Sequence, residues 1–179
     1  MSARGLALIR TFALASAAGA LLTACADAPL PSGAVGSPAP EYAARTLDGD
    51  TVSLADLRGD AVLLNVWATW CPPCRKEMPD LQALHEEFED AGLRVVGISI
   101  DAAGADEVVR EFLRDYGITY TILRDPDDRI TQLFPAPGVP ITVLVDANGK
   151  ISWRHLGPVT ADDPGLRAAI AAALPPRGK

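Results

Sequence analysis

Residues 61–79 read AVLLNVWATWCPPCRKEMP, and this stretch decides which fold the chain adopts. The run from Ala61 to Trp67 is nearly continuous in apolar residues, as expected of a strand that is covered on both faces. Cys71 and Cys74 follow, separated by two prolines that the first turn of a helix can accept. The stretch therefore predicts a central strand that leads into a helix with a cysteine pair at its start.

The spacing of these cysteines allows their sulfurs to bond to one another across Pro72 and Pro73. At a helix N-terminus, unpaired N–H groups and the macrodipole favour negative charge, so Cys71 is expected to ionise more readily than a free thiol. Thiols in such positions have pKa values of about 3.5 to 7.5. Cys71, ahead of the helix body, is the predicted nucleophile, and Cys74, one turn inside, is the predicted resolving thiol.

Outward from this stretch, apolar patterns and turn residues predict alternating strands and helices. Strands are expected at 41–46, 51–54, 61–67, 94–100, 119–123, 141–145 and 151–155. Helices are expected around 78–88, 108–116, 127–134 and 161–174. Val108, Phe112 and Tyr116 mark the second of these, and Leu166, Ile170 and Ala173 are expected to face inward in the last. This order predicts the α/β fold class, with a mixed central β-sheet flanked by helices and an N-terminal β-hairpin.

The first 24 residues have the features of an export signal. Arg4 and Arg10 flank the start of the apolar run 11–22, which is shorter than the roughly 20 residues of a membrane span. Leu22-Thr23-Ala24-Cys25 resembles the lipobox of bacterial lipoproteins, in which the cysteine receives lipid and becomes the first mature residue. We therefore expect a lipoprotein signal peptide at 1–24 and lipid on Cys25; an ordinary cleaved signal peptide is the alternative.

Composition after the signal predicts a tether followed by one domain. Residues 26–40 consist mostly of Ala, Pro, Gly and Ser, which bury too little apolar surface to fold alone. We expect a lipid-anchored flexible linker at 25–37 and a domain at 38–176, on the extracytoplasmic side of a bacterial membrane, periplasmic in a Gram-negative cell. Loss of residues 1–24 would change the net charge from −7 to −9, which disfavours binding to nucleic acid or to an anionic membrane surface.

Residues 65–79 resemble the thioredoxin superfamily, and within it the membrane-tethered TlpA- and ResA-like thiol–disulfide oxidoreductases with a redoxin domain. The resemblance extends over 36–174 and includes the extension at 36–40 and an inserted strand–helix region at about 100–125. It implies a thioredoxin-like fold, with Cys71 as the attacking thiol and Cys74 as the resolving thiol. It also implies that Trp70 covers the site and that Pro79 kinks the helix.

Residues 138–142 resemble the cis-proline segment that faces the cysteines in this superfamily. The resemblance implies a cis bond between Val139 and Pro140, and a Val139 backbone that pairs with an incoming peptide strand. The residues alone would favour a trans proline that enters a strand.

One departure from thioredoxins proper lies six positions before Cys71, where Asn65 replaces a buried aspartate. An asparagine side chain cannot accept a proton from Cys74 as a carboxylate would. Glu77, three residues after Cys74, shares its helical face. We hypothesise that Glu77 accepts the Cys74 proton and tunes both thiols; a solvated surface acid is the alternative.

Together these features predict a protein-disulfide reductase that needs no cofactor and no metal. Its expected partners are exported proteins with cysteine pairs, for example an apocytochrome c or a copper-site assembly protein, and a membrane thiol reductant that recycles the dithiol. The alternatives are a thiol oxidant on the same fold, a copper-binding assembly chaperone in which a distant histidine such as His155 completes a Cu(I) site, and a thiol peroxidase.

The sequence disfavours three other kinds of site. Haem attachment would need histidine after the second cysteine, where the chain has Arg75. A peroxidase motif would need Pro and Thr where Trp67 and Ala68 stand. A structural zinc site would need four ligands, and the chain does not offer them in a finger-like pattern.

The segment 85–87 is expected to be a solvated helix face, and Trp153 and His155 are expected to belong to the closing hairpin.

Overall fold

Strand β3 (Ala61–Trp67) is buried along its whole length in a seven-stranded sheet, as its apolar run predicts. The computed structural model describes residues 32–176, and the expected signal peptide and Cys25 lie outside the described residues. The other strands are β1 (Ala43–Thr46), β2 (Thr51–Ser53), β4 (Leu93–Ser99), β5 (Thr121–Arg124), β6 (Ile141–Val145) and β7 (Ile151–Leu156). The helices are α1 (Pro72–Phe88), the 3-10 turn η1 (Glu89–Ala91), α2 (Asp106–Tyr116), α3 (Arg129–Leu133) and α4 (Pro164–Ala173).

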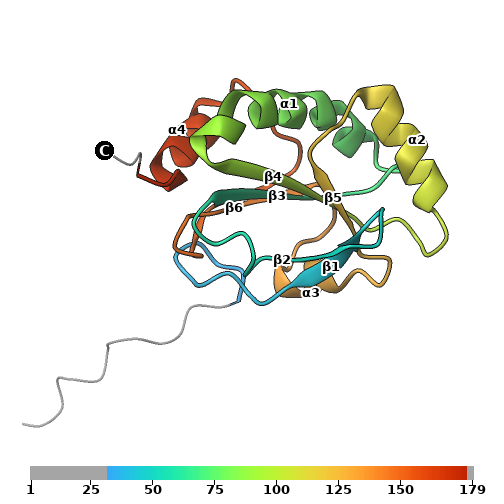
Figure 1. Cartoon of the computed structure of the whole chain (residues 1–179), viewed down its shortest axis with the longest axis horizontal. Helices are drawn as coiled ribbons and strands as arrows, with labels where there is room; N and C mark the ends of the chain where they lie inside the picture. Colours follow the sequence, from blue (N-terminus) through green and yellow to red (C-terminus); the bar gives the residue numbers. More distant parts are fainter. Residues whose placement is uncertain (1–31, 177–179) are drawn as a thin grey trace, which may run out of the picture.

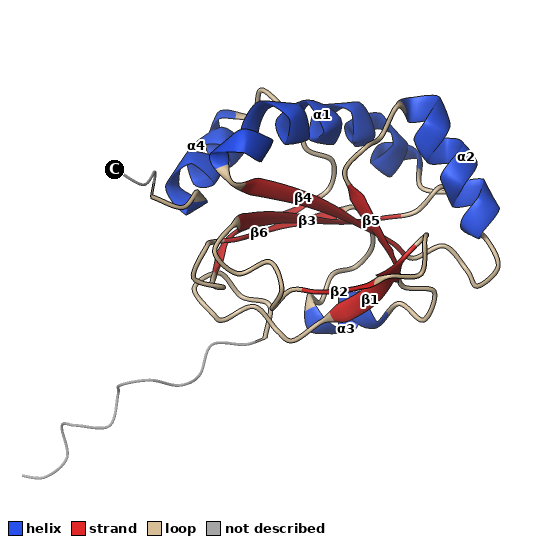
Figure 2. Ribbon diagram, viewed as in Figure 1, coloured by secondary structure: helices blue, strands red, loops and turns tan. Residues whose placement is uncertain are grey.

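The sheet is mixed, in the order β2-β1-β5-β4-β3-β6-β7. Strands β3, β4 and β5 are parallel neighbours, and the remaining pairs are antiparallel. Helices α1, α2 and α4 cover one face, and α3 lies on the other (Figure 1, Figure 2). This arrangement is the thioredoxin-like α/β fold with an N-terminal hairpin that the sequence predicts.

Alternate residues of β3 divide the core into two clusters. Leu63 and Trp67 face the helices and pack with residues such as Leu81. Val62 and Leu64 face the opposite side, where α3 and the N-terminal hairpin lie. Because both faces are covered, the strand is apolar throughout except at Asn65.

Two expected details differ in the structure. In α2, Val109 is fully buried with Phe112, whereas Val108 is 55% exposed because it lies about 100° around the helix from its neighbour. Strand β5 begins at Thr121 rather than at Thr119, because Thr119 exchanges two hydrogen bonds with Gln82 of α1.

Ordered contacts begin before Pro38, the expected start of the domain. The backbones of Gly36 and Ser37 exchange hydrogen bonds with Ile151 of β7, at 2.8 and 3.0 Å. Ala39 donates its N–H to the carbonyl of Gly149 at 2.9 Å. The part of the expected tether at 32–37 therefore packs against the closing hairpin, because these backbone groups pair with the edge strand.

In the described part of the chain, no helix has the length and apolar character of a membrane span.

Candidate active site around the cysteine pair

Cys71 and Cys74 form a disulfide where β3 ends and α1 begins. Cys71 is the N-cap of α1, and its Sγ accepts the backbone N–H of Cys74 at 3.2 Å. Cys74 is fully buried, and Cys71 is 3% exposed. Pro72 and Pro73 occupy the first helical positions, where no intrahelical N–H donor is needed. In the dithiol form, this N-cap geometry would stabilise a Cys71 thiolate.

The segment before β6 forms the facing wall of the site. Its Val139–Pro140 peptide bond is cis, as expected. The carbonyl oxygen of Val139 lies 3.7 Å from Cys71 Sγ. The two are neighbours because β6 runs antiparallel to β3, with Ile141 opposite Val66, so its start lies beside the end of β3.

Glu77 lies on the buried side of α1, three residues after Cys74. Only 1% of it is exposed, so the alternative of a solvated surface acid is wrong. Its two carboxylate oxygens accept hydrogen bonds from Asn65 Nδ2 at 2.8 Å and from the Val159 N–H at 2.9 Å. Burial raises the pKa of Glu77 to about 7, although these two hydrogen bonds oppose the shift. Glu77 can therefore gain or release a proton near neutral pH.

Asn65 connects Glu77 to the strand that carries the facing wall. Its Nδ2 donates to Glu77 and also to Thr142 Oγ1 of β6, at 3.1 Å. Its Oδ1 is buried and has no hydrogen-bond partner among the described residues. Sequence reasoning missed Thr142 and Val159 as partners. Thr142 could have been found because it lies in the cis-proline segment, whereas no local signal indicates Val159.

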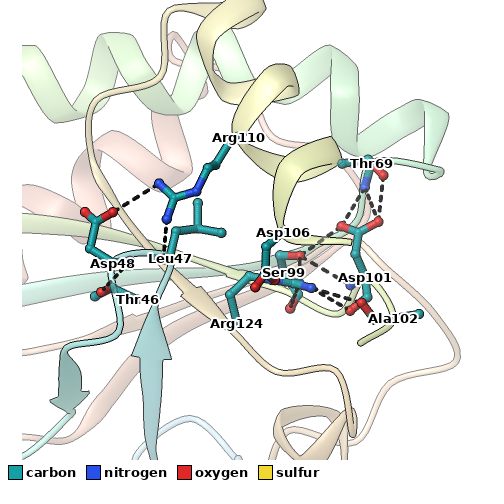
Figure 3. A network of polar contacts seen from close by, with 10 residues as sticks. All are labelled: Thr46, Leu47, Asp48, Thr69, Ser99, Asp101, Ala102, Asp106, Arg110 and Arg124. Atoms are coloured by element: carbon teal, nitrogen blue, oxygen red, sulfur yellow. Dashed lines mark hydrogen bonds and ion pairs between the residues drawn. The ribbon is translucent and has the colours of Figure 1, made fainter. Parts of the chain in front are cut away.

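The loop between β3 and Cys71 is held by a second carboxylate that the sequence analysis did not single out (Figure 3). Asp101 is 3% exposed and accepts hydrogen bonds from the Thr69 N–H at 3.0 Å and the Thr69 hydroxyl at 2.6 Å. Ser99 donates its hydroxyl to the same carboxylate at 2.8 Å. The signal was available, since the carboxyl ends of the parallel strands β3 and β4 meet at one edge of the sheet.

Arg124, at the end of β5, completes this network (Figure 3). Its guanidinium donates to Ser99 Oγ at 2.6 Å and to Asp106 at 2.8 Å. It also donates to the backbone carbonyls of Ser99, Asp101 and Ala102. All five N–H groups of Arg124 therefore have acceptors, and the inserted region is tied to the loop that precedes Cys71.

Trp70 is 63% exposed and directly precedes Cys71. It lines a groove of about 510 Å³ together with Pro72, Arg75, Lys76, Pro79 and Tyr116. Pro79 lies within α1, as expected.

The two histidines lie on different elements, His85 on α1 and His155 on β7. His85 is only 13% exposed at its side chain and packs edge-on against Tyr120, so the expected solvated face of 85–87 is wrong at this residue. The ring of Tyr120, 6.0 Å from that of His85, covers this side of the imidazole. Glu86 and Glu87 are exposed, as expected. Trp153 and His155 stack on one another in β7, as expected for the closing hairpin. Within residues 32–176, no group of three or more His, Cys, Asp or Glu side chains is placed to hold a metal ion.

Comparisons with known proteins agree with this geometry. The model of the AhpC/TSA family matches residues 35–154. The thiol-disulfide oxidoreductase ResA of Oceanobacillus iheyensis is 36% identical over 132 residues, which cover 72% of this chain and 68% of that protein.

Two solved structures are similar over most of their length. One is a thiol:disulfide interchange protein DsbE from Chlorobium tepidum, with a TM-score of 0.71 and 33% identity over 78% of this chain and 97% of that one. The other is a secreted thiol-disulfide isomerase from Corynebacterium glutamicum, with a TM-score of 0.65 and 29% identity over 76% of this chain and 83% of that one.

Proposed function

The chain belongs to the AhpC/TSA family and is a thiol–disulfide oxidoreductase similar to ResA, and from that premise we propose that it reduces disulfides of exported proteins. The observation that carries this proposal is the Cys71–Cys74 disulfide at the N-terminus of α1, with the Val139 carbonyl 3.7 Å from Cys71 Sγ. A helix N-terminus favours a thiolate at Cys71, and an adjacent backbone can align a peptide that carries the target disulfide.

The reaction proceeds from the dithiol form in two exchange steps. The Cys71 thiolate attacks one sulfur of the partner disulfide, so that a mixed disulfide forms and the partner's second sulfur leaves as a thiolate. The Cys74 thiolate then attacks Cys71 Sγ, which forms the Cys71–Cys74 disulfide and releases the partner's first sulfur. The partner gains two electrons and, with two protons, becomes a dithiol. A membrane thiol reductant returns the enzyme to its dithiol form.

Glu77 serves in this scheme as the base for Cys74. It lies three residues after Cys74 on α1, is buried, and has a pKa raised by burial to about 7. A base with a pKa near the working pH accepts a proton readily and is still largely available at neutral pH. If Glu77→Gln left both thiol titrations and the reduction rate unchanged, this role would be excluded.

The facing wall and the residues around the disulfide support the incoming polypeptide. Val139 offers its backbone to an extended partner strand, and Pro140 fixes the start of β6 next to it. Trp70, Pro72 and Pro73 form the surface around Cys71 on the other side. These roles are supported by their position against the disulfide and by the resemblance to the thioredoxin superfamily.

Export and anchoring complete the proposal. Residues 1–24 direct the chain out of the cytoplasm, Cys25 carries lipid, a linker from 25 leads to the domain, and the domain works on the extracytoplasmic side of the membrane. One similar solved structure is described as a secreted protein, which supports this side. The expected partners are exported proteins with cysteine pairs, such as an apocytochrome c or a copper-site assembly protein.

A trapping experiment in the native host tests this function. Cys74→Ser removes the resolving thiol, so the mixed disulfide on Cys71 should accumulate and its partner can be identified by mass spectrometry. The matched control Cys71→Ser/Cys74→Ser should capture nothing. If the partner's thiols become oxidised in cells that lack the protein, the direction is reduction. Capture of no exported cysteine-containing protein, or a partner that becomes reduced in those cells, would contradict the proposal.

A further inference from the structure

The side chain of Arg75, the residue after Cys74, packs against two aromatic rings. Phe112 and Tyr116 of α2 stack with ring centroids 4.2 Å apart. The guanidinium carbon of Arg75 lies 5.7 Å from the Phe112 centroid and 6.0 Å from that of Tyr116. Arg75 Nε also donates to the Tyr116 hydroxyl at 3.4 Å. Cation–π contacts and this hydrogen bond restrict the side chain before any partner arrives.

The held cation lacks a counterion in the described part of the chain. Between residues 32 and 176, no carboxylate lies within 4.0 Å of Arg75 or of its neighbour Lys76. Six other arginines in the same range do have such a partner, namely Arg94, Arg110, Arg114, Arg124, Arg129 and Arg167. Arg45, Arg58, Lys150 and Arg154 also have no such partner, so what distinguishes Arg75 and Lys76 is that they follow the cysteine pair directly and that Arg75 is held by aromatic rings.

These cations line the groove of about 510 Å³ that begins beside the disulfide. Its other lining residues are Trp70, Pro72, Pro79 and Tyr116, so the groove combines apolar and aromatic walls with positive charge and has no acidic lining residue. Trp70 lines the groove, is 63% exposed and directly precedes Cys71 in the sequence. A segment bound here would therefore be close in sequence to a cysteine that reacts with Cys71.

We propose that this groove selects partner proteins that carry acidic residues next to the reacting cysteine. The inference rests on the proposed function, because it assigns the partner class of the same site. A carboxylate of the partner would pair with the guanidinium of Arg75 and the ammonium of Lys76, while an apolar neighbour packs on Trp70. Arg75 is suited to this contact because its planar donors pair with a carboxylate in two places and its orientation is already fixed.

The test compares three oxidised peptides that share one cysteine pair and differ only in flanking residues, which are Glu, Gln or Lys. The reduced protein is mixed with each peptide, and the second-order rate of exchange is followed by tryptophan fluorescence. Each rate is divided by the rate of the same peptide with dithiothreitol, which removes differences in intrinsic reactivity. The variants are Arg75→Gln/Lys76→Gln and Arg75→Glu, and the matched control is Lys150→Gln, which removes an exposed cation from the turn between β6 and β7.

The acidic peptide should react about fivefold faster than the basic one at low salt, and the ratio should shrink at about 0.5 M salt, where the Debye length is only a few ångströms. The ratio should fall towards one in the double variant, invert in Arg75→Glu and persist in Lys150→Gln. Equal rates for the three peptides, or an equal rate change for all three in the variants, would overturn the inference and leave the function standing. Failure to reduce any peptide would instead overturn the proposed function, and this inference with it.

Discussion

At the scale of single residues, the site depends on polar groups buried in an otherwise apolar core. Asn65 is the only polar residue of β3, and its amide bridges Glu77 of α1 and Thr142 of β6. The carboxylate of Glu77 loses its hydration and gains only two hydrogen bonds, so its charged form is disfavoured. This balance raises its pKa to about 7, a value that suits the base role proposed for Glu77.

We expect Glu77 to make the oxidised protein less stable as the pH rises. Its pKa is about 7 in the folded protein and 4.5 in the reference state, so the folded form binds the proton more tightly. The contribution of Glu77 to stability is therefore fully present below pH 4.5 and is lost as the pH rises through about 7, by about 3 kcal/mol in all. Glu77→Gln should remove this decline in urea unfolding curves, whereas Glu111→Gln on exposed α2 should not. Parallel pH profiles for wild type and Glu77→Gln would contradict the prediction.

Gly97 in β4 allows the ring of Trp67 to lie against the strand beneath the site. A Cβ atom at this position would lie 2.6 Å from Ile122 Cδ1, 3.0 Å from Trp67 Nε1 and 3.2 Å from Tyr120 Cε2. Gly97→Ala should therefore lower the free energy of unfolding by about 1–3 kcal/mol, because three buried side chains would have to shift to make room for the methyl group. Gly138→Ala is the matched control, since its Cβ would meet nothing within 4 Å. Equal thermal midpoints for the two variants would show that the core can relax around the added methyl.

At the scale of elements, the active-site loop is positioned by strands that are distant in the sequence. Asp101 follows β4 and holds Thr69, which follows β3, and Arg124 ends β5 (Figure 3). The three parallel strands end at one edge of the sheet, so their polar residues meet there. The inserted region therefore contributes to the site by fixing the loop that leads to Cys71.

Arg124→Lys should destabilise the protein although it preserves the charge. A lysine has three donors on one nitrogen and cannot reach the five acceptors that Arg124 satisfies, so buried carbonyls would lose their partners. We expect a loss of about 2–4 kcal/mol in urea unfolding. The control Arg114→Lys, whose side chain is 62% exposed and pairs only with Glu107, should change stability by less than about 0.5 kcal/mol. A similar effect of both substitutions would refute the role of the network.

At the scale of the whole molecule, the segment before β1 pairs with the hairpin of β6 and β7 at the edge of the sheet. Gly36, Ser37 and Ala39 pair with the backbone of residues 149–151, and Arg154 donates to the Gly33 carbonyl. These contacts cover backbone groups of the last hairpin that would otherwise be exposed. The domain therefore includes residues that composition alone assigns to a tether.

A chain that begins at Glu41 should be less stable than one that begins at Ser32. The shorter chain loses three backbone hydrogen bonds to the β7 hairpin, which together contribute about 2–4 kcal/mol. Ala39→Pro in the longer chain removes only the N–H of Ala39 and should cost about 1 kcal/mol. Thermal unfolding of the three proteins checks this order. Identical midpoints for the two chain lengths would mean that the segment contributes no stability.

Much of the fold could be predicted because its signals are local. The apolar run of β3, the cysteine pair with its prolines and the glycine turns of both hairpins depend on neighbours along the chain. The inward residues Leu166 and Ile170 of α4 follow from the helical period for the same reason. Predictions were less accurate where a tertiary contact competes with a local pattern, as at Thr119, which bonds to Gln82 of α1 instead of extending β5.

The sequence by itself determined the chemistry of this protein: a redox pair at a helix start, on an α/β frame, with a nearby acid on the same helical face. Only the tertiary structure decided how that chemistry is supported. It buries Glu77 between Asn65 and the Val159 N–H, ties Thr69 to Asp101, and lays Arg75 on rings of α2. Those partners are separated by 12 to 82 residues, and their meeting depends on strand register and helix packing, which no local pattern encodes.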